Sequence, residues 1–456
     1  MASNIPRVKM KALEPGVRNR NFEVFLKGYT KEEAMAEASR CLGCKVPGCR
    51  EGCPVNNDIP QFLAAVREGD FAKAYAYICE RSNLSEICGT VCPHEDQCEG
   101  HCIRGIKSEP VAIGGVERFV SQWARENGLT KLKVKASTGK TVACVGSGPA
   151  TMACAQILAA KGYKVVVYEE KEYIGGVLAW GIPSYRLGRE VIDDKIQALK
   201  DAGVEFRLGE KISDANELAK VYDAVFLGTG ATVPTRMGIP GESLEGVYTA
   251  AEFLSKINLA PISEDGRRHF DACGKRILVV GGGNVAMDAA RDAVRLAQAE
   301  KVYIVYRRTE EEMPACSEEL EHAKEEGIEF CTLRNPVEFM GENGRLTQAV
   351  CAVMELGEPD SSGRRRPVET EERVTFDIDT AVLALGFSND KEISESTEGL
   401  DADKWGCFTV NENGRTSIPN VYAGGDAVTG AATVVKAMKA GMIAAKSIME
   451  QLKEEQ

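Results

Sequence analysis

The chain has 456 residues, of which 44% are hydrophobic and 27% charged. This is the composition of a globular protein with room for two or three hydrophobic cores. A formal net charge of −12 argues against a nucleic-acid partner, because phosphates would be repelled. No run of 18 apolar residues occurs, and the first residues, MASNIPRVKMKALEPG, lack the apolar stretch of a signal peptide. No membrane partner is therefore predicted, and the cytoplasm is the expected location.

Three segments are predicted along the chain. Residues 1–135 combine most of the cysteines with helical patterns, and the polar linker KASTGK follows. From TVACVG onward, short apolar strands alternate with helices, which indicates an α/β fold. Two glycine-rich turns, in VACVGSGPATMACAQILAAKG and ILVVGGGNVAMDAARDAV, each follow an apolar strand and predict two Rossmann-like nucleotide domains. We expect residues 136–247 and 382–456 to form one domain, with residues 248–381 inserted as the other.

The cysteines are concentrated near the N-terminus. Nine of the sixteen lie between Cys41 and Cys102. A cytosolic protein keeps its thiols reduced, so such a dense block favours metal ligation over disulfides. The other seven are scattered singly and are expected to be small buried hydrophobic residues. These seven are Cys144, Cys154, Cys273, Cys316, Cys331, Cys351 and Cys407.

The cysteine block contains two groups of possible ligands. The first reads C-x2-C-x4-C-x3-C-P from Cys41, and the second reads C-x3-C-P-x4-C-x3-C from Cys88. Close thiolates on a turn, followed by a proline, suit a cubane iron–sulfur cluster, and ferredoxin-type chains share ligands between neighbouring groups. The alternative is structural zinc, which normally uses two similar C-x2-C pairs or histidines. Only one C-x2-C pair occurs here, so two iron–sulfur clusters are favoured.

Several strings resemble one protein family over essentially the whole chain. They are CLGCKVPGCREGCPVNNDIPQF, ICGTVCPHEDQCEGHCIRG and VAIGGVERFV, together with both glycine-rich turns. They look like the small subunit of NADPH-dependent glutamate synthase. The same domain recurs in the N-terminal half of dihydropyrimidine dehydrogenase and in the large subunit of NADH-dependent reduced-ferredoxin:NADP oxidoreductase. The resemblance implies that residues 1–135 form a helical domain that binds two [4Fe–4S] clusters.

The resemblance also implies the ligands of each cluster. One cluster takes three cysteines of the first group and the last of the second, and the other takes an oxygen ligand in place of a fourth sulfur. A hard oxygen donor would change the potential of that cluster. The oxygen ligand is Glu117, for which the alternative is a solvated helix residue, and Cys88 is left as a packing residue. The implied ligands are Cys41, Cys44, Cys49 and Cys102 for cluster one, and Cys53, Cys92, Cys98 and Glu117 for cluster two.

The first glycine-rich turn follows the strand TVACV and opens a helix. Gly146 makes the tight turn, Gly148 lets the backbone approach a pyrophosphate, and the helix N-terminus supplies positive charge. Thr151 stands where the third glycine is usual, so we expect the helix to lie slightly further from the strand. Glu169 ends the next strand, where it can accept a hydrogen bond from a ribose 2′-hydroxyl.

Further motifs favour FAD over NAD at this first turn. The sequence IPNVYAGGDAVTG resembles the second flavin motif of two-dinucleotide flavoproteins, in which Asp426 contacts the ribityl or phosphate part of FAD. The alternative for Asp426 is a plain turn or helix cap. AVFLGTGA, with Thr229 and Gly230, resembles the crossover motif of the same superfamily, and Gly175 and Gly176 also match it.

The second turn, GGGNVA, is followed by the strand VYIVY, which ends in two arginines where an NAD site would place an acid. Two planar guanidinium groups can each donate two hydrogen bonds to a 2′-phosphate, which favours NADP(H) over NAD(H). The alternative is that the following Thr-Glu-Glu supplies the acid and the arginines are solvated. The residues assigned to NADP(H) are Gly281, Gly283, Asn284, Arg307 and Arg308.

These cofactors predict an NADPH-dependent electron-transfer enzyme. A hydride passes from NADPH to the flavin, and single electrons continue to the clusters. No side chain is assigned as a catalytic nucleophile or base. The acceptor is expected to be a partner subunit, as in glutamate synthase, because no amidotransferase or 2-oxoglutarate site can be found. Alternatives are the electron-bifurcating ferredoxin:NADP oxidoreductase, a sulfide dehydrogenase-like flavoprotein, or a non-catalytic scaffold.

Overall fold

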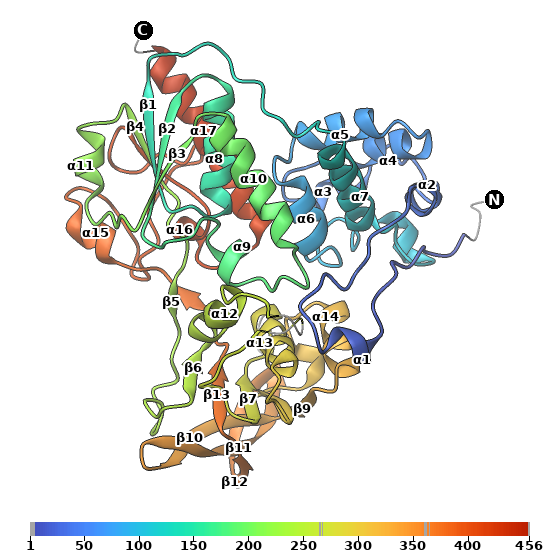
Figure 1. Cartoon of the computed structure of the whole chain (residues 1–456), viewed down its shortest axis with the longest axis vertical. Helices are drawn as coiled ribbons and strands as arrows, with labels where there is room; N and C mark the ends of the chain where they lie inside the picture. The colour runs from blue at the N-terminus through green and yellow to red at the C-terminus, as the bar shows by residue number, and fades with distance from the viewer. Residues whose placement is uncertain (1–4, 264–265, 267, 360–362, 364, 455–456) are drawn as a thin grey trace.

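The computed structural model describes the whole chain except residues 1–4, 264–265, 267, 360–362, 364 and 455–456. Three lobes are visible: a helical lobe at the N-terminus and two α/β lobes, each built on a parallel sheet (Figure 1). The predicted α/β class with an N-terminal helical domain is confirmed. None of the helices in the described part of the chain is long and apolar enough to cross a membrane.

The helical lobe packs its longer helices around one apolar core. Thr30 and Glu33 form the reciprocal capping box that starts α2, in which each side chain accepts a hydrogen bond from the other residue's backbone. Phe62, Ile78 and Val116 lie fully buried where α4, α5 and α7 meet. The helices are α1 (Pro15–Arg18), α2 (Lys31–Ala38), α3 (Gly48–Glu51), α4 (Ile59–Arg67), α5 (Phe71–Cys79), α6 (Ser85–Val91), the 3-10 helix η1 (Ile103–Ile106) and α7 (Ile113–Glu126).

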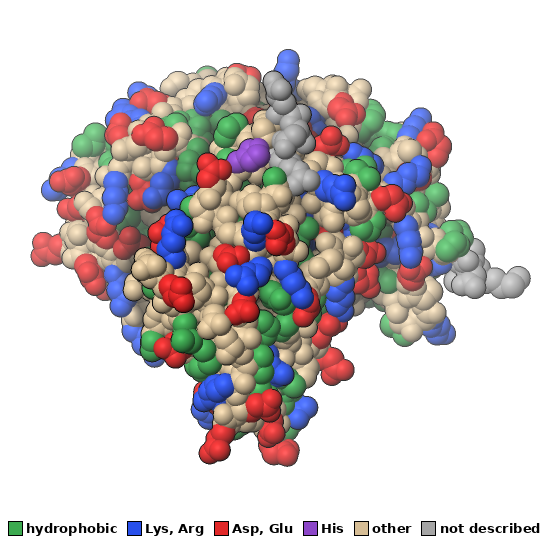
Figure 2. Space-filling view, turned by 60° about the horizontal axis from the view of Figure 1, so that its bottom comes forward, with side chains coloured by type: hydrophobic (Ala, Val, Ile, Leu, Met, Phe, Trp, Pro, Cys, Tyr) green, Lys and Arg blue, Asp and Glu red, His purple; other side chains and the backbone are tan. Residues whose placement is uncertain are grey.

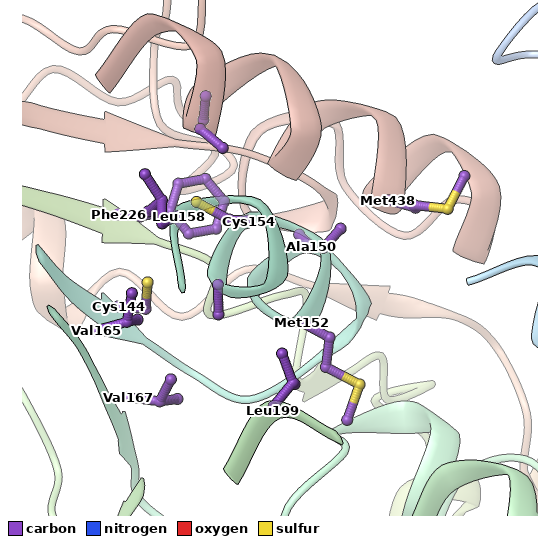
Figure 3. Close-up of a cluster of buried hydrophobic side chains, with 14 of the residues drawn as sticks. Cys144, Ala150, Met152, Cys154, Leu158, Val165, Val167, Leu199, Phe226 and Met438 are labelled. Atoms are coloured by element: carbon purple, nitrogen blue, oxygen red, sulfur yellow. The ribbon is translucent and has the colours of Figure 1, made fainter. Parts of the chain in front are cut away.

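The first α/β lobe has a parallel sheet in the order β15-β4-β1-β2-β3. Its core lies between this sheet and the helices α8 and α17, where Cys144 and Cys154 point inward as small apolar side chains (Figure 3). The two helices approach closely because Gly441 has no side chain: a Cβ there would lie 2.0 Å from the Ala150 carbonyl oxygen. The elements are β1 (Thr141–Val145), α8 (Pro149–Ala160), β2 (Lys164–Glu169), α9 (Val177–Trp180), α10 (Arg189–Asp201), β3 (Glu205–Leu208), α11 (Ala215–Ala219), β4 (Ala224–Leu227), α15 (Glu392–Ser396), β15 (Val421–Ala423), α16 (Asp426–Thr429) and α17 (Val434–Glu454).

The second α/β lobe has a parallel sheet in the order β6-β13-β7-β8-β9, with a three-stranded antiparallel extension, β10-β11-β12. The segment 357–370 joins β11 to β12 as a hairpin, and its tip lies outside the described residues. The elements are β6 (Val247–Thr249), α12 (Ala250–Asn258), β7 (Arg276–Val280), α13 (Asn284–Arg295), β8 (Lys301–Tyr306), η2 (Glu310–Glu312), α14 (Ser317–Glu325), β9 (Glu329–Thr332), β10 (Arg334–Glu342), β11 (Arg345–Pro359), β12 (Arg365–Asp377) and β13 (Thr380–Leu383).

The chain crosses between the two α/β lobes through a small antiparallel pair, β5 (Val233–Pro234) and β14 (Phe387–Ser388). The expected domain limits at 247 and 382 instead pass through β6 and β13, which both belong to the second sheet. The sequence could not show to which sheet β6 and β13 belong, because a short apolar strand has the same pattern in either sheet. Only the pairing of the strands assigns each one to a sheet.

The segment before α2 ties the second lobe to the rest of the molecule. Phe22 and Phe25 pack in the core of the second lobe together with Tyr185 from the first. Arg18 Nε donates a 2.9 Å hydrogen bond to Glu326, and both side chains are almost fully buried. Buried ion pairs of this kind hold their partners in one geometry, since separating them would leave a buried charge unpaired.

Of the seven scattered cysteines, four are buried as expected and three are partly exposed. The buried ones are Cys144, Cys154, Cys273 and Cys351, and the partly exposed ones are Cys316, Cys331 and Cys407.

Candidate functional site

Four cysteines of the N-terminal lobe line one small cavity. Cys41 and Cys44 lie in the loop after α2, Cys49 lies in α3, and Cys102 directly precedes η1. Burial, followed by the negative charge of the neighbouring thiols, raises the pKa of Cys49 to about 12. The same two causes raise the pKa of Cys41. Four thiols crowded in an apolar cavity are stable as thiolates only when a positive centre sits among them.

Four further side chains gather between α3, α6 and α7. Burial raises the pKa of the Cys98 and Cys53 thiols, and the nearby Glu117 carboxyl raises both further. A hydrogen bond with the Cys88 thiol, followed by burial, raises the pKa of Cys92. The expected second ligand group therefore lies together in space, and Cys88 lies beside it.

Glu117 projects from α7 into this second group. Burial alone raises the pKa of its carboxyl to about 8. No hydrogen bond or ion pair to its carboxyl occurs among the described residues. Glu117 is half-buried, and its carboxyl has no donor within the described part of the protein. The carboxyl is therefore available to a metal centre at this site.

No group of three His, Cys, Asp or Glu side chains in the described part of the chain is close enough to share one metal ion.

A large pocket runs between the two α/β lobes and reaches the helical lobe. The sequence motifs did not indicate many of its lining residues. Among them are Trp180 and Phe387, whose rings meet edge to face at a centroid distance of 5.8 Å, and Val91 and Pro93, which flank Cys92. For Val91 and Pro93, the proline after Cys92 was the one signal in the sequence. The residues assigned to FAD all line this pocket: Gly146, Gly148, Glu169, Gly176, Thr229, Gly230 and Asp426.

The first turn has the geometry that a nucleotide-binding turn requires. Gly146 has φ +86°, and a Cβ there would lie 2.6 Å from the Gly228 carbonyl oxygen. Gly148 has nothing within 4 Å of an added Cβ, so its open side is available to a ligand. Thr151 fits where a glycine is usual because Gly228 faces it: a Cβ on Gly228 would lie 2.3 Å from Thr151 Oγ1.

The acid at the end of β2 already has partners within the protein. Glu169 Oε2 accepts hydrogen bonds from Ser147 N at 2.9 Å and Ser147 Oγ at 2.6 Å, and Oε1 accepts one from Lys171 N at 3.0 Å. Glu169 therefore stabilises the turn as well as lining the pocket. The expected contact with a ribose hydroxyl would use the remaining acceptor capacity of this carboxylate.

Asp426 is the best-placed acceptor for a flavin. It starts α16 directly after Gly425, whose φ is +72°. Burial raises the pKa of its carboxyl to about 6, and Oδ1 has no partner among the described residues. A buried acceptor without a donor at the wall of a pocket fits a ligand hydroxyl, such as those of the ribityl chain.

The second turn is built in the same way as the first. Gly281 has φ +141°, and a Cβ there would lie 2.4 Å from the Ala384 carbonyl oxygen. Gly283 is the N-cap of α13, so the first amides of that helix point outward. Asn284 Oδ1 accepts from Cys316 N at 2.9 Å, which ties the turn to the start of α14. Asn284 also lines the large pocket.

The two arginines expected to bind a 2′-phosphate follow β8 directly. Arg307 is exposed and Arg308 is half-buried. Neither forms an ion pair with any described acidic residue. Their guanidiniums are thus available to an anion at the end of β8.

Comparison with known proteins identifies the class. Residues 140–441 match the family described as pyridine nucleotide-disulphide oxidoreductase, and residues 18–129 match dihydropyrimidine dehydrogenase domain II, 4Fe-4S cluster. The chain is thus an oxidoreductase of the two-dinucleotide class with an iron–sulfur domain. It is 36% identical over 451 residues to the glutamate synthase [NADPH] small chain of Escherichia coli (strain K12), spanning 96% of this chain and 95% of that one. The protein belongs to the glutamate synthase small chain family.

Other similar proteins have different stated roles. The NADP(+)-dependent formate dehydrogenase subunit beta of Moorella thermoacetica is 37% identical over 439 residues, and the match covers 89% of this chain but 60% of that subunit. FprA of Mycobacterium tuberculosis, solved in complex with NADPH, superposes with a TM-score of 0.57 at 21% identity, over 69% of this chain and 85% of that one. The FprA match shows a shared fold.

Proposed function

We propose that this chain is the electron-input subunit of a larger oxidoreductase, which takes electrons from NADPH through FAD to two [4Fe–4S] clusters. The observation that carries the proposal is the large pocket between the two α/β lobes. It is lined by the FAD-motif residues, by Asn284 and Val285 at the start of α13, and by Val91 and Pro93 on either side of Cys92. When bound, FAD accepts a hydride and releases the electrons singly to the clusters.

The protein's own residues bind and orient these groups. The amides at the starts of α8 and α13 would hold the two pyrophosphates, and the Asp426 carboxylate would accept a hydrogen bond from a flavin hydroxyl. Val91 and Pro93 line the pocket on either side of Cys92. A cluster held by Cys92 would therefore be the one nearer the flavin.

The other ligand group, Cys41, Cys44, Cys49 and Cys102, lies further from the pocket and has apolar side chains exposed around it. These are Leu42 (48% exposed), Val46 (72%), Ile103 (45%) and Ile106 (78%). Exposed apolar side chains gathered around one site mark a protein–protein contact. We infer that electrons leave this chain through cluster one to a partner subunit docked on these four side chains.

The partner decides the overall reaction. Similarity to the glutamate synthase small chain over nearly the full length favours a partner that makes glutamate. The 37% identity to the formate dehydrogenase subunit favours, as a second candidate, a partner that acts on formate. Purification of the chain with its native partner, followed by assays for glutamine-dependent glutamate formation and for formate oxidation, distinguishes the two.

The first test of the proposal is cofactor content. We expect about one FAD, eight iron and eight acid-labile sulfide in the anaerobically purified chain, the sum for one flavin and two cubanes. Cys92→Ala and Glu117→Ala should each disturb one cluster, whereas Cys88→Ala, a change in the same motif, should leave both. Stoichiometric zinc without iron would rule out electron transfer. Loss of a cluster in Cys88→Ala alone would overturn the ligand assignment.

The second test concerns the electron donor and the exit. NADPH should reduce an artificial dye, and Arg307→Ala with Arg308→Ala should raise the KM for NADPH about ten- to a hundredfold while leaving that for NADH within a few-fold. Val46→Asp with Ile106→Asp should leave dye reduction intact and weaken electron delivery to the partner. A preference of the wild-type protein for NADH would contradict the assignment of NADP(H).

A further inference from the structure

Five arginines without acidic partners lie where the second parallel sheet meets its antiparallel extension. No ion pair in the described part of the chain involves any of them, although the protein has more acidic than basic residues. Two other arginines of the same extension do pair: Arg345 with Glu245 at 2.7 Å and Arg373 with Glu369 at 2.6 Å. Basic and acidic side chains are interspersed over the face of the molecule shown in Figure 2. The five are Arg307, Arg308, Arg334, Arg365 and Arg366.

Hydrogen bonds join the strand end to the β11–β12 hairpin. Arg308 Nε donates to the Arg365 carbonyl oxygen at 3.0 Å, across 57 residues of sequence. The Leu333 amide donates to the Arg308 carbonyl oxygen, also at 3.0 Å. Because Nε of Arg308 is held by the hairpin, its two terminal nitrogens keep a fixed direction and have no partner among the described residues.

The guanidinium of Arg365 is held by its own hairpin. Its Nε donates to the Gly357 carbonyl at 3.3 Å, and Nη2 donates to the Leu356 carbonyl at 3.1 Å. Nη1 has no partner among the described residues, so both of its N–H donors and the full positive charge remain for a ligand. A guanidinium positioned in advance loses less side-chain freedom when it binds.

The position of this group identifies the anion. The end of the second strand of a Rossmann domain is where the ribose 2′-substituent lies, and here that strand is β8. We propose that Arg365, carried by the β11–β12 hairpin, is a third residue of the 2′-phosphate subsite formed by Arg307 and Arg308, and that its backbone carbonyl orients Arg308. This inference rests on the proposed use of NADPH and extends it to a residue far away in the sequence.

Arg365→Gln in the full-length protein tests the idea. Binding of 2′,5′-ADP, measured by calorimetry, should weaken about five- to twentyfold, the loss of one charge-assisted contact at an exposed site. Binding of 5′-AMP should stay unchanged because it has no 2′-phosphate. The KM should rise for NADPH and stay unchanged for NADH. Arg373→Gln is the matched control, since it removes a charge from the same strand where Glu369 already pairs with it.

Three results would overturn the role of Arg365, and they show whether the proposed use of NADPH fails with it. Unchanged 2′,5′-ADP binding in Arg365→Gln, with weaker binding in Arg307→Ala/Arg308→Ala, would reject Arg365 and keep NADPH. Unchanged binding in both variants would reject the NADP assignment as well. Equal weakening for 2′,5′-ADP and 5′-AMP would mean that Arg365 only holds the hairpin. If Arg365→Gln does not fold, Arg365→Lys keeps the charge and should still weaken 2′,5′-ADP binding selectively.

Discussion

Replacing Gly228 with alanine tests how the first nucleotide turn accommodates Thr151. A Cβ at Gly228 would lie 2.3 Å from Thr151 Oγ1 and 2.9 Å from the ring of Phe226. Thr151 is 1% exposed and its hydroxyl has no hydrogen-bond partner among the described residues, so the side chain cannot turn toward solvent. We expect Gly228→Ala to destabilise the domain by about 1–3 kcal/mol, the usual cost of overpacking a core. FAD retention should fall with it, because Gly228 lines the pocket.

A second substitution shows whether Thr151 is the cause. Thr151→Ala removes a buried hydroxyl that has no partner and leaves a small gap, so alone it should change stability by less than about 1 kcal/mol. In the double variant the new Cβ meets only Phe226. The double variant should therefore be more stable, by about 1–2 kcal/mol, than the sum of the two single effects predicts.

Stability is measured as the urea midpoint of the FAD-free protein, followed by circular dichroism, and FAD per chain is measured separately after gel filtration. Midpoints are compared because a chain of several domains need not unfold in one step. Gly148→Ala is the matched control: an added Cβ there meets nothing within 4 Å, so it should lower FAD binding without changing the stability of the FAD-free protein. Additive effects of Gly228→Ala and Thr151→Ala would refute the reasoning.

Three further predictions follow from buried groups. Asp426→Ala should lower FAD affinity about tenfold, because a buried acceptor is lost. Burial raises the pKa of this carboxyl to about 6, so the FAD affinity of the wild type should fall as the pH drops through that value. Fluorescence titration should show this pH dependence in the wild type and not in the variant. Asp292 is buried on α13 without a hydrogen-bond partner in the described structure, and burial raises its pKa to about 8. Its neutral form is favoured by folding, so its contribution to stability is complete below the ordinary pKa of 3.8 and is lost as the pH rises toward about 8. Asp292→Asn should therefore gain stability relative to wild type between pH 5 and pH 9, measured as urea midpoints, and a constant difference would contradict this. Removing Arg18 by substitution with Met should lower the urea midpoint of the second lobe at every pH, because Glu326 would lose one of its buried partners.

The sequence by itself determined the local parts of this protein. Both strand–turn–helix units were predictable because a glycine such as Gly146, with its positive φ, and the apolar strand before it are local signals. The spacing of Cys41, Cys44 and Cys49 likewise predicted a cluster site, since close thiolates need no distant element to face one another. The location of Glu117 among the second cysteine group could not come from spacing, and only the family resemblance indicated it.

The tertiary structure decided which of these local units meet. Val91 and Pro93 lie at the flavin pocket because the helical lobe packs against both nucleotide domains, and no pattern in their own neighbourhood encodes that contact. The tie between Arg308 and Arg365 depends on the pairing of β11 with β12. The limits of the inserted domain likewise followed from the pairing of β6 and β13, which the apolar character of either strand leaves undetermined. Contacts between distant segments depend on the packing of the whole chain, and local sequence patterns carry almost no information about them.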